Sequence, residues 1–120
     1  LEPVRGMKDF IGDLSTWYLR RSRERIKEEA ANPSTMLGAR QTLYFVLKTL
    51  AKVLAPFAPF AAEDIWLKLK NDNDVESVHL TEWPKAGNIN EDVLGYMKIT
   101  RDIVSKALQT RQKEKITNDY

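Results

Sequence analysis

The chain has 120 residues, enough for one domain with a modest hydrophobic core that needs no disulfides. Its 42% apolar and 30% charged residues are typical of a soluble globular protein rather than a disordered one. No stretch approaches the roughly 20 consecutive apolar residues that span a bilayer, so a transmembrane protein is excluded. The absence of cysteine excludes disulfides, thiol catalysis and cysteine-ligated zinc, and favours a cytoplasmic protein. A single histidine, His79, weighs against a histidine-built metal site.

The first half of the chain has the three-and-four spacing of apolar residues that predicts helices. One helix is expected over residues 2–30. Asn32 and Pro33 then form a cap and a first-turn proline, which predict the start of a second helix. Its apolar stripe continues to about Leu54.

Two prolines in residues 55–60 must end this second helix, because each lacks an amide donor and disfavours helical geometry in the residue before it. Pro59 can open a third helix that runs to about Lys70 and buries Trp66 as a structural residue. Residues 71–74 are typical of a turn.

The remaining segments are a short extended piece near residues 77–80 and a last helix that ends at about Lys115. Asn88 and Glu91 have the spacing of a capping box at the start of that helix. We therefore expect an all-α fold, an antiparallel bundle of four main helices within a single domain over residues 1–120. The chain opens with leucine and has no basic-then-apolar leader, so we expect a fragment of a longer protein without a signal peptide.

Basic residues gather in two segments, although the net charge is only +2. Residues 20–27 hold five basic residues and one acid, and residues 98–115 hold six basic residues and two acids. Between them, residues 72–92 carry six carboxylates against Lys85. If the two basic segments converge in space, they would form a polyanion-binding face.

The basic residues of the first segment divide by helical position. Arg20, Arg23 and Lys27 share one face, which is either a solvated charged face or a set of phosphate contacts. Arg21 instead continues the apolar stripe that contains Trp17, a residue type that at this spacing belongs more often to a core than to a base-stacking site.

A half-buried arginine requires a carboxylate, and Glu63 or Asp64 is the expected partner of Arg21. The same two acids also suit the first turn of the third helix. No metal cluster, phosphate-binding glycine loop or nucleophile motif is present, so a stand-alone enzyme is the least favoured class.

Four segments in order resemble class I aminoacyl-tRNA synthetases for branched aliphatic amino acids. They are residues 13–23 (DLSTWYLRRSR), 54–66 (LAPFAPFAAEDIW), 76–84 (ESVHLTEWP) and 97–111 (MKITRDIVSKALQTR). The third and fourth segments look most like the isoleucine members, and the leucine and valine members share enough of the pattern to stay open.

The resemblance implies the helical anticodon-binding domain that follows the catalytic domain of these enzymes. Because the HIGH and KMSKS motifs of adenylate chemistry are absent here, this part is expected to be non-catalytic, with ATP and magnesium handled elsewhere in the parent enzyme. The implied partners are tRNA and the remaining domains of the synthetase, with neither DNA nor a membrane.

The resemblance also ranks the candidate RNA-binding residues. Arg20 and Arg23 fall within the first segment, Lys27 lies beside it, and Arg101 and Arg111 match the arginines of the last one. Two alternatives stay open. One is a helical protein-interaction module, and the other is a structural spacer whose basic residues are only solvated, so that reversing their charges would leave tRNA charging unchanged.

Overall fold

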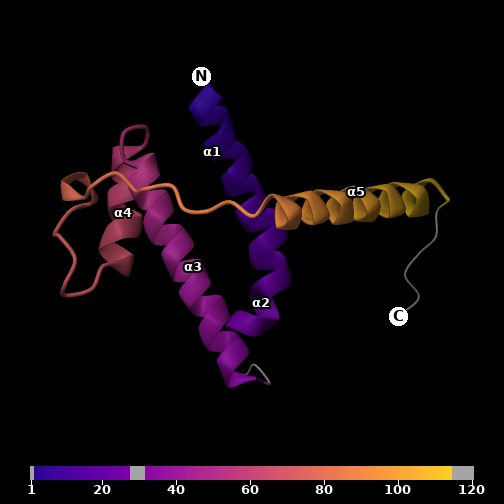
Figure 1. Cartoon of the computed structure of the whole chain (residues 1–120), viewed down its shortest axis with the longest axis horizontal. Helices are drawn as coiled ribbons and strands as arrows, with labels where there is room; N and C mark the ends of the chain where they lie inside the picture. Colours follow the sequence, from indigo (N-terminus) through magenta and orange to yellow (C-terminus); the bar gives the residue numbers. More distant parts are fainter. Residues whose placement is uncertain (1, 28–31, 115–120) are drawn as a thin grey trace. The chain divides into compact units, whose positions relative to one another are not determined.

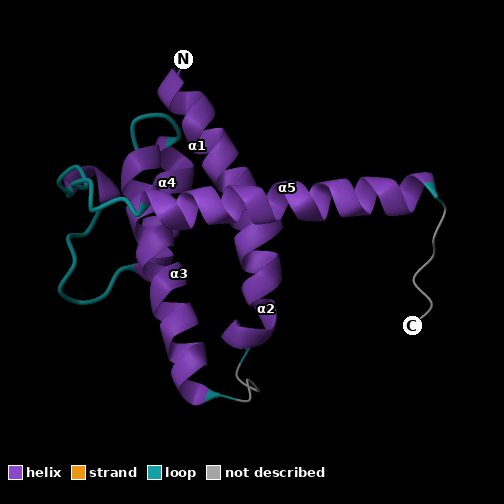
Figure 2. Ribbon diagram, turned by 45° about the vertical axis from the view of Figure 1, so that its right-hand side comes forward, coloured by secondary structure: helices purple, strands orange, loops and turns teal. Residues whose placement is uncertain are grey.

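The computed structural model of this chain describes residues 2–27 and 32–114. Within these ranges every regular element is a helix, as expected for an all-α protein (Figures 1 and 2). The elements are α1 (Glu2–Asp13), the π-helix η1 (Leu14–Leu19), α2 (Arg20–Ile26), α3 (Pro33–Leu54), α4 (Pro59–Leu69), the 3₁₀ helix η2 (Val78–Leu80) and α5 (Glu91–Lys113). The four expected main helices are therefore confirmed, the first as the continuous run α1–η1–α2. Its expected last residues, 28–30, lie outside the described part.

The chain divides into two compact units, Leu1–Pro84 and Lys85–Tyr120. In the first unit α3 is the central helix, since α2 and α4 both pack on it. Figure 1 shows α2 beside the beginning of α3 and α4 beside its end. Each of these two connections reverses the chain, so consecutive helices run antiparallel.

The boundaries of α3 and α4 follow the expected capping and proline chemistry. The Asn32 side chain accepts hydrogen bonds from the backbone N–H groups of Ser34 and Thr35 at 3.1 and 3.4 Å, with Pro33 in the first helical position. At the other end α3 stops at Leu54, and Pro59 begins α4. Both predictions are confirmed because a local rule decides each of them.

The core of this unit lies where α3, α4 and η2 meet. It consists of Ala51, Ala62, Trp66 and Val78, none more than 2% exposed. The Trp66 indole N–H donates to the backbone carbonyl of Val75 at 3.1 Å, so the buried polar atom is satisfied. Small residues on α3 and α4 leave room for the indole between the helices.

Residues 78–80 form a 3₁₀ turn rather than the extended segment expected near residues 77–80; only Ser77 is extended. The Ser77 hydroxyl accepts from the His79 N–H at 3.2 Å, and the Leu80 N–H donates to the Ser77 carbonyl at 3.1 Å. These local hydrogen bonds compete with an extended backbone. The turn buries Val78 in the core.

The π-helix η1 changes which side chains of the first helix face inward. An α-helix turns about 100° per residue, so Leu14 and Arg21 would share a face. A π segment adds one residue to the turn. The inward position therefore moves from Arg21 to Ser22, which is 1% exposed, while Arg21 is exposed. The hydroxyl of Thr16 bonds back to the carbonyl of Gly12 at 2.7 Å, within the region where the helix widens.

The second unit contains α5, which runs from Glu91 to Lys113; the expected end at Lys115 lies outside the described residues. Its N-cap is Asn90, whose side chain accepts from the Val93 N–H at 3.1 Å. The prediction of Asn88 as the cap was therefore wrong by two residues. Capping from Asn90 places two carboxylates, including that of Glu91, in the first turn, where the helix dipole favours them.

Candidate nucleic-acid interface

The α2 helix carries the most concentrated positive charge of the described chain. Arg20 and Arg23 are both exposed and lie three residues apart in regular α-helix, so they share a side of α2 as predicted. Among the described residues no ion pair involves Arg20 or Arg23. Two planar guanidinium groups in this arrangement can each bind a phosphate through two hydrogen bonds.

Lys27 stands at the C-cap of α2, where the backbone has already left the helix. Its ammonium group pairs with the Glu24 carboxylate at 2.8 Å. The hydrogen bond from Lys27 and the attraction of its charge lower the pKa of Glu24, and Arg23 adds to the effect. The charge of Lys27 is therefore partly offset by a neighbour, which makes it a weaker phosphate ligand than Arg20.

The expected ion pair of Arg21 with Glu63 or Asp64 is absent from the described residues. Glu63 instead accepts from the Ser77 hydroxyl at 3.0 Å and from the Val78 N–H at 2.9 Å, and Asp64 pairs with Lys68 at 2.6 Å. The prediction failed because the π-helix turns Arg21 outward.

Arg21 and Trp17 instead interact with each other. The guanidinium of Arg21 lies 5.4 Å from the centre of the half-buried Trp17 ring, a cation–π contact within the first helix.

Two arginines that were not among the predicted site residues hold α2 in place. Arg25 donates to the hydroxyl of the buried Ser22 at 2.8 Å. From α3, Arg40 donates to the carbonyl of Ile26, the last residue of α2, at 2.9 Å. The second contact bridges 14 residues of sequence, and no periodic pattern in the sequence signals it.

The other predicted basic residues lie on α5. Arg101 is half-buried and Arg111 is exposed in the last turn. Both interact with other groups of the chain. The convergence of the two basic segments remains a prediction.

A third basic feature, Lys48 on α3, has a structural role. Its ammonium group donates to the carboxylate of Asp74 and to the hydroxyl of Tyr44, and lies 5.2 Å from the centre of the Trp66 ring. The two charged side chains are 18% and 19% exposed. This ion pair fastens the turn after α4 to α3.

The Lys48–Asp74 pair predicts a pH dependence of stability. The hydrogen bond from Lys48, and then one from the Asn71 N–H, lower the pKa of Asp74. Burial opposes the charge on Lys48, but hydrogen bonds to Asp74 and Tyr44 outweigh it and raise the pKa of Lys48. The stabilisation from Asp74 is complete above its unfolded pKa, about 3.9, and is lost as the pH falls through the lower folded value. That from Lys48 is complete below about 10.4 and is lost as the pH rises through the higher folded value.

We therefore expect the thermal midpoint of the wild type to fall more steeply than that of Asp74→Asn below about pH 4. The same comparison with Asp72→Asn, an exposed aspartate in the same turn, controls for the general effect of removing a carboxylate. Equal slopes for the wild type and Asp74→Asn would contradict the assigned role of the pair.

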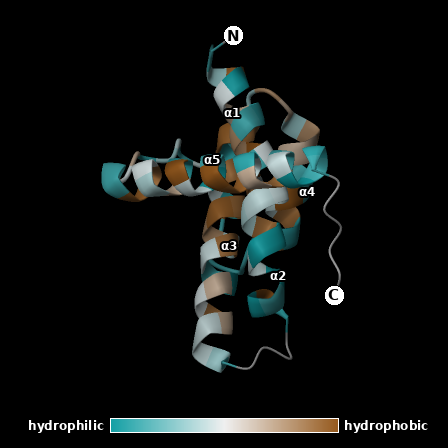
Figure 3. Cartoon of the chain, turned by 90° about the vertical axis from the view of Figure 1, so that its right-hand side faces the viewer, coloured by the Kyte–Doolittle hydropathy of each residue, from teal (hydrophilic) through white to brown (hydrophobic). Residues whose placement is uncertain are grey.

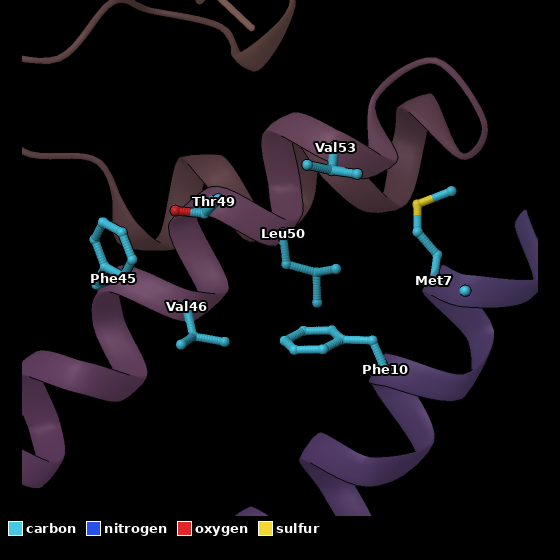
Figure 4. A pocket seen from close by; sticks show the side chains of 8 residues that line it. Met7, Phe10, Phe45, Val46, Thr49, Leu50 and Val53 are labelled. Atoms are coloured by element: carbon cyan, nitrogen blue, oxygen red, sulfur yellow. The ribbon is translucent and has the colours of Figure 1, made fainter. Parts of the chain in front are cut away.

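A second surface feature of the first unit is apolar. A cavity of about 350 Å³ lies between α1 and α3, and Figure 4 shows Phe10 of α1 facing Leu50 of α3 across it. In Figure 3 the hydrophobic residues of α3 gather in its middle and upper turns, while its beginning is more hydrophilic. Phe10 and Phe45, which also lines the cavity, are 46% and 69% exposed.

The described helices include none that is both long and apolar enough to cross a lipid bilayer. Three or more histidine, cysteine, aspartate or glutamate side chains that could together hold a metal ion are likewise not found among the described residues. What the described site offers chemically is an exposed pair of arginines on a helical scaffold.

The sequence matches the profile of one protein family over residues 4–120, the anticodon-binding domain of tRNA ligases. The chain belongs to this family. It is 41% identical over 110 residues to an isoleucine–tRNA ligase of Chlamydia muridarum (strain MoPn / Nigg), which covers 90% of this chain and 10% of that protein.

Two further relatives are also isoleucine–tRNA ligases. That of Chlamydia pneumoniae is 42% identical over 109 residues, 89% of this chain and 10% of the relative. That of Dehalococcoides mccartyi (strain CBDB1) is 40% identical over 114 residues, 91% of this chain and 11% of the relative. The chain thus spans about a tenth of the length of the curated relatives it matches.

Proposed function

We propose that this chain is the tRNA-binding part of an isoleucine–tRNA ligase, and that it holds the tRNA while a separate catalytic part performs ATP-dependent aminoacylation. The observation that carries the proposal is the exposed pair Arg20 and Arg23, which stands inside the family match. The similarity to isoleucine–tRNA ligases over 90% of the chain supports isoleucine rather than leucine or valine.

The mechanism is electrostatic docking. The guanidinium groups of Arg20 and Arg23 bind phosphate oxygens and release the counterions condensed on the RNA. Lys27 adds a weaker contact because Glu24 competes for its ammonium group. Arg101 and Arg111 on α5 provide a second set of phosphate contacts. These contacts orient the tRNA but do not by themselves read its sequence.

The parent enzyme supplies what this chain lacks. ATP and magnesium belong to its catalytic part, and the two compact units described here together serve as one anticodon-binding domain over residues 1–120. Such an enzyme acts where its tRNA is, which places it in the cytoplasm. A second role, as a protein-interaction surface, is favoured by the apolar cavity between α1 and α3. The remaining domains of the ligase are its proposed partners.

A binding titration tests the proposal. The chain is titrated with isoleucine, leucine and valine tRNAs at about 50 and about 200 mM salt, the range over which phosphate-driven binding weakens strongly. We expect binding that is tightest for the isoleucine tRNA and falls steeply with salt. Each phosphate contact contributes about 0.7 to 0.9 to the slope of log affinity against log salt.

Each other outcome removes part of the proposal. Equal affinity for the three tRNAs would remove the specificity for isoleucine and keep the docking role. Salt-independent binding would favour apolar docking over phosphate contacts. Absence of binding at both salt concentrations would reject tRNA docking by this chain and favour the interaction or spacer role.

A further inference from the structure

A small cavity with a mixed lining lies at the end of α3, away from the arginines of α2 in the sequence. Its volume is about 210 Å³, and it is enclosed by the last turns of α3 and by the segment that follows η2. Ligand pockets for drug-sized molecules measure about 300–1,000 Å³, so this cavity suits a single planar ring system.

The chemistry of the lining divides into an apolar floor and a polar rim. Val78, which is 2% exposed, and Pro56 supply apolar surface. Lys52, His79 and Glu82 supply a cation, an imidazole and a carboxylate. A flat ligand with hydrogen-bonding edges matches such a lining better than an aliphatic or a highly charged one does.

Trp83 borders this cavity and is 61% exposed, although tryptophan is normally well buried. Buried Trp66, by contrast, is fully engaged in the core. An indole face beside a cavity of this size is a stacking platform, because unpaired bases of RNA loops stack on aromatic side chains and bond through their edges.

We propose that this cavity binds one unstacked base of the tRNA anticodon loop, with the base stacked on Trp83. His79 and Glu82 then offer donors and acceptors to the edge of the base, and Lys52 offers a positive charge to its phosphate. The inference rests on the proposed tRNA-binding function and adds a base contact that the arginines of α2 do not provide.

The test compares Trp83→Ala with the wild-type chain in titrations with an anticodon stem–loop RNA of the isoleucine tRNA. Stacking of one base is worth about 5- to 150-fold in affinity, so we expect a loss in this range. Because stacking releases no counterions, the salt slope should stay unchanged. Trp83→Phe, which keeps an aromatic face, should recover much of the affinity. Phe60→Ala removes another aromatic side chain, 91% exposed, and should have no effect.

A double-mutant cycle then identifies the base. Loop positions of the RNA are made abasic one at a time, and each RNA is titrated with the wild type and with Trp83→Ala. At one position the abasic change should weaken the wild type by the same factor as Trp83→Ala and leave the variant unaffected. Free AMP, added as a competitor, should not displace the RNA, because the base is held through the loop.

The outcomes separate the two proposals. If the wild type fails to bind the RNA, the proposed function fails and this inference with it. If the wild type binds with a steep salt dependence but Trp83→Ala binds equally well, or every cycle is additive, the base site alone is wrong. Displacement by free AMP would also overturn it and would indicate a nucleotide site instead.

Discussion

Reversing both charges in Arg20→Glu/Arg23→Glu is expected to weaken tRNA binding by about 100-fold or more. Each hydrogen bond to a charged group contributes about 1.5–3 kcal/mol, and each introduced carboxylate adds repulsion from the phosphates. Both side chains are exposed in regular helix, so the change should leave the fold intact. Filter binding at low salt measures the loss, and circular dichroism confirms that the helices remain.

The matched control moves the same charge change to another helix. Arg5→Glu/Lys8→Glu reverses two exposed basic residues on α1. If tRNA binding depends on contacts at α2, this control should bind nearly as well as the wild type. A neutral variant, Arg20→Gln/Arg23→Gln, should lower the salt slope by about 1.4 to 1.8, the share of two phosphates. Equal losses for the α1 and α2 reversals would indicate that net charge, rather than a local site, drives binding.

Replacing Trp66 with alanine is expected to lower the free energy of unfolding by about 3–5 kcal/mol. The side chain is 2% exposed, its N–H donates to the Val75 carbonyl, and the ammonium groups of Lys48 and Lys52 lie over its ring. The stability of a whole domain is about 5–15 kcal/mol, so this one change removes a large part of it. Urea unfolding followed by circular dichroism gives the value.

Trp83→Ala is the control for this measurement, because it makes the same substitution at a tryptophan that is 61% exposed. Its free energy of unfolding should stay within about 0.5 kcal/mol of the wild type. Similar losses for the two tryptophans would contradict the assignment of Trp66 to the core. They would also complicate the reading of Trp83 as a binding residue, so the two stability measurements precede the RNA titrations.

Several helix boundaries could be predicted from the sequence because local chemistry decides them. Asn32 and Pro33 determine the start of α3, and the prolines after Leu54 determine its end. Trp66 could be assigned to the core from its helical position alone. The exposed pair on α2 could likewise be predicted, since residues three apart in a regular helix share a side.

Other features depend on information that periodicity does not contain. The partner of Glu63 is the turn at Ser77, which comes close only after α4 and η2 have packed together. Asn88 and Asn90 are equally good caps in the sequence, and only the observed start of α5 decides between them. The outward position of Arg21 depends on a π-helix, for which the sequence carries no clear mark.

The π-helix η1 also makes the first helix sensitive to length. Removing one residue from Leu14–Leu19 would let the segment rewind as α-helix and rotate everything after it by about 100°. Arg21 would then occupy the buried position that Ser22 holds now, and a guanidinium would have to enter a site sized for a hydroxyl. A deletion here is therefore far costlier than most single substitutions in the same six residues. The number of residues in this segment, as much as their identity, decides which arginines face the solvent.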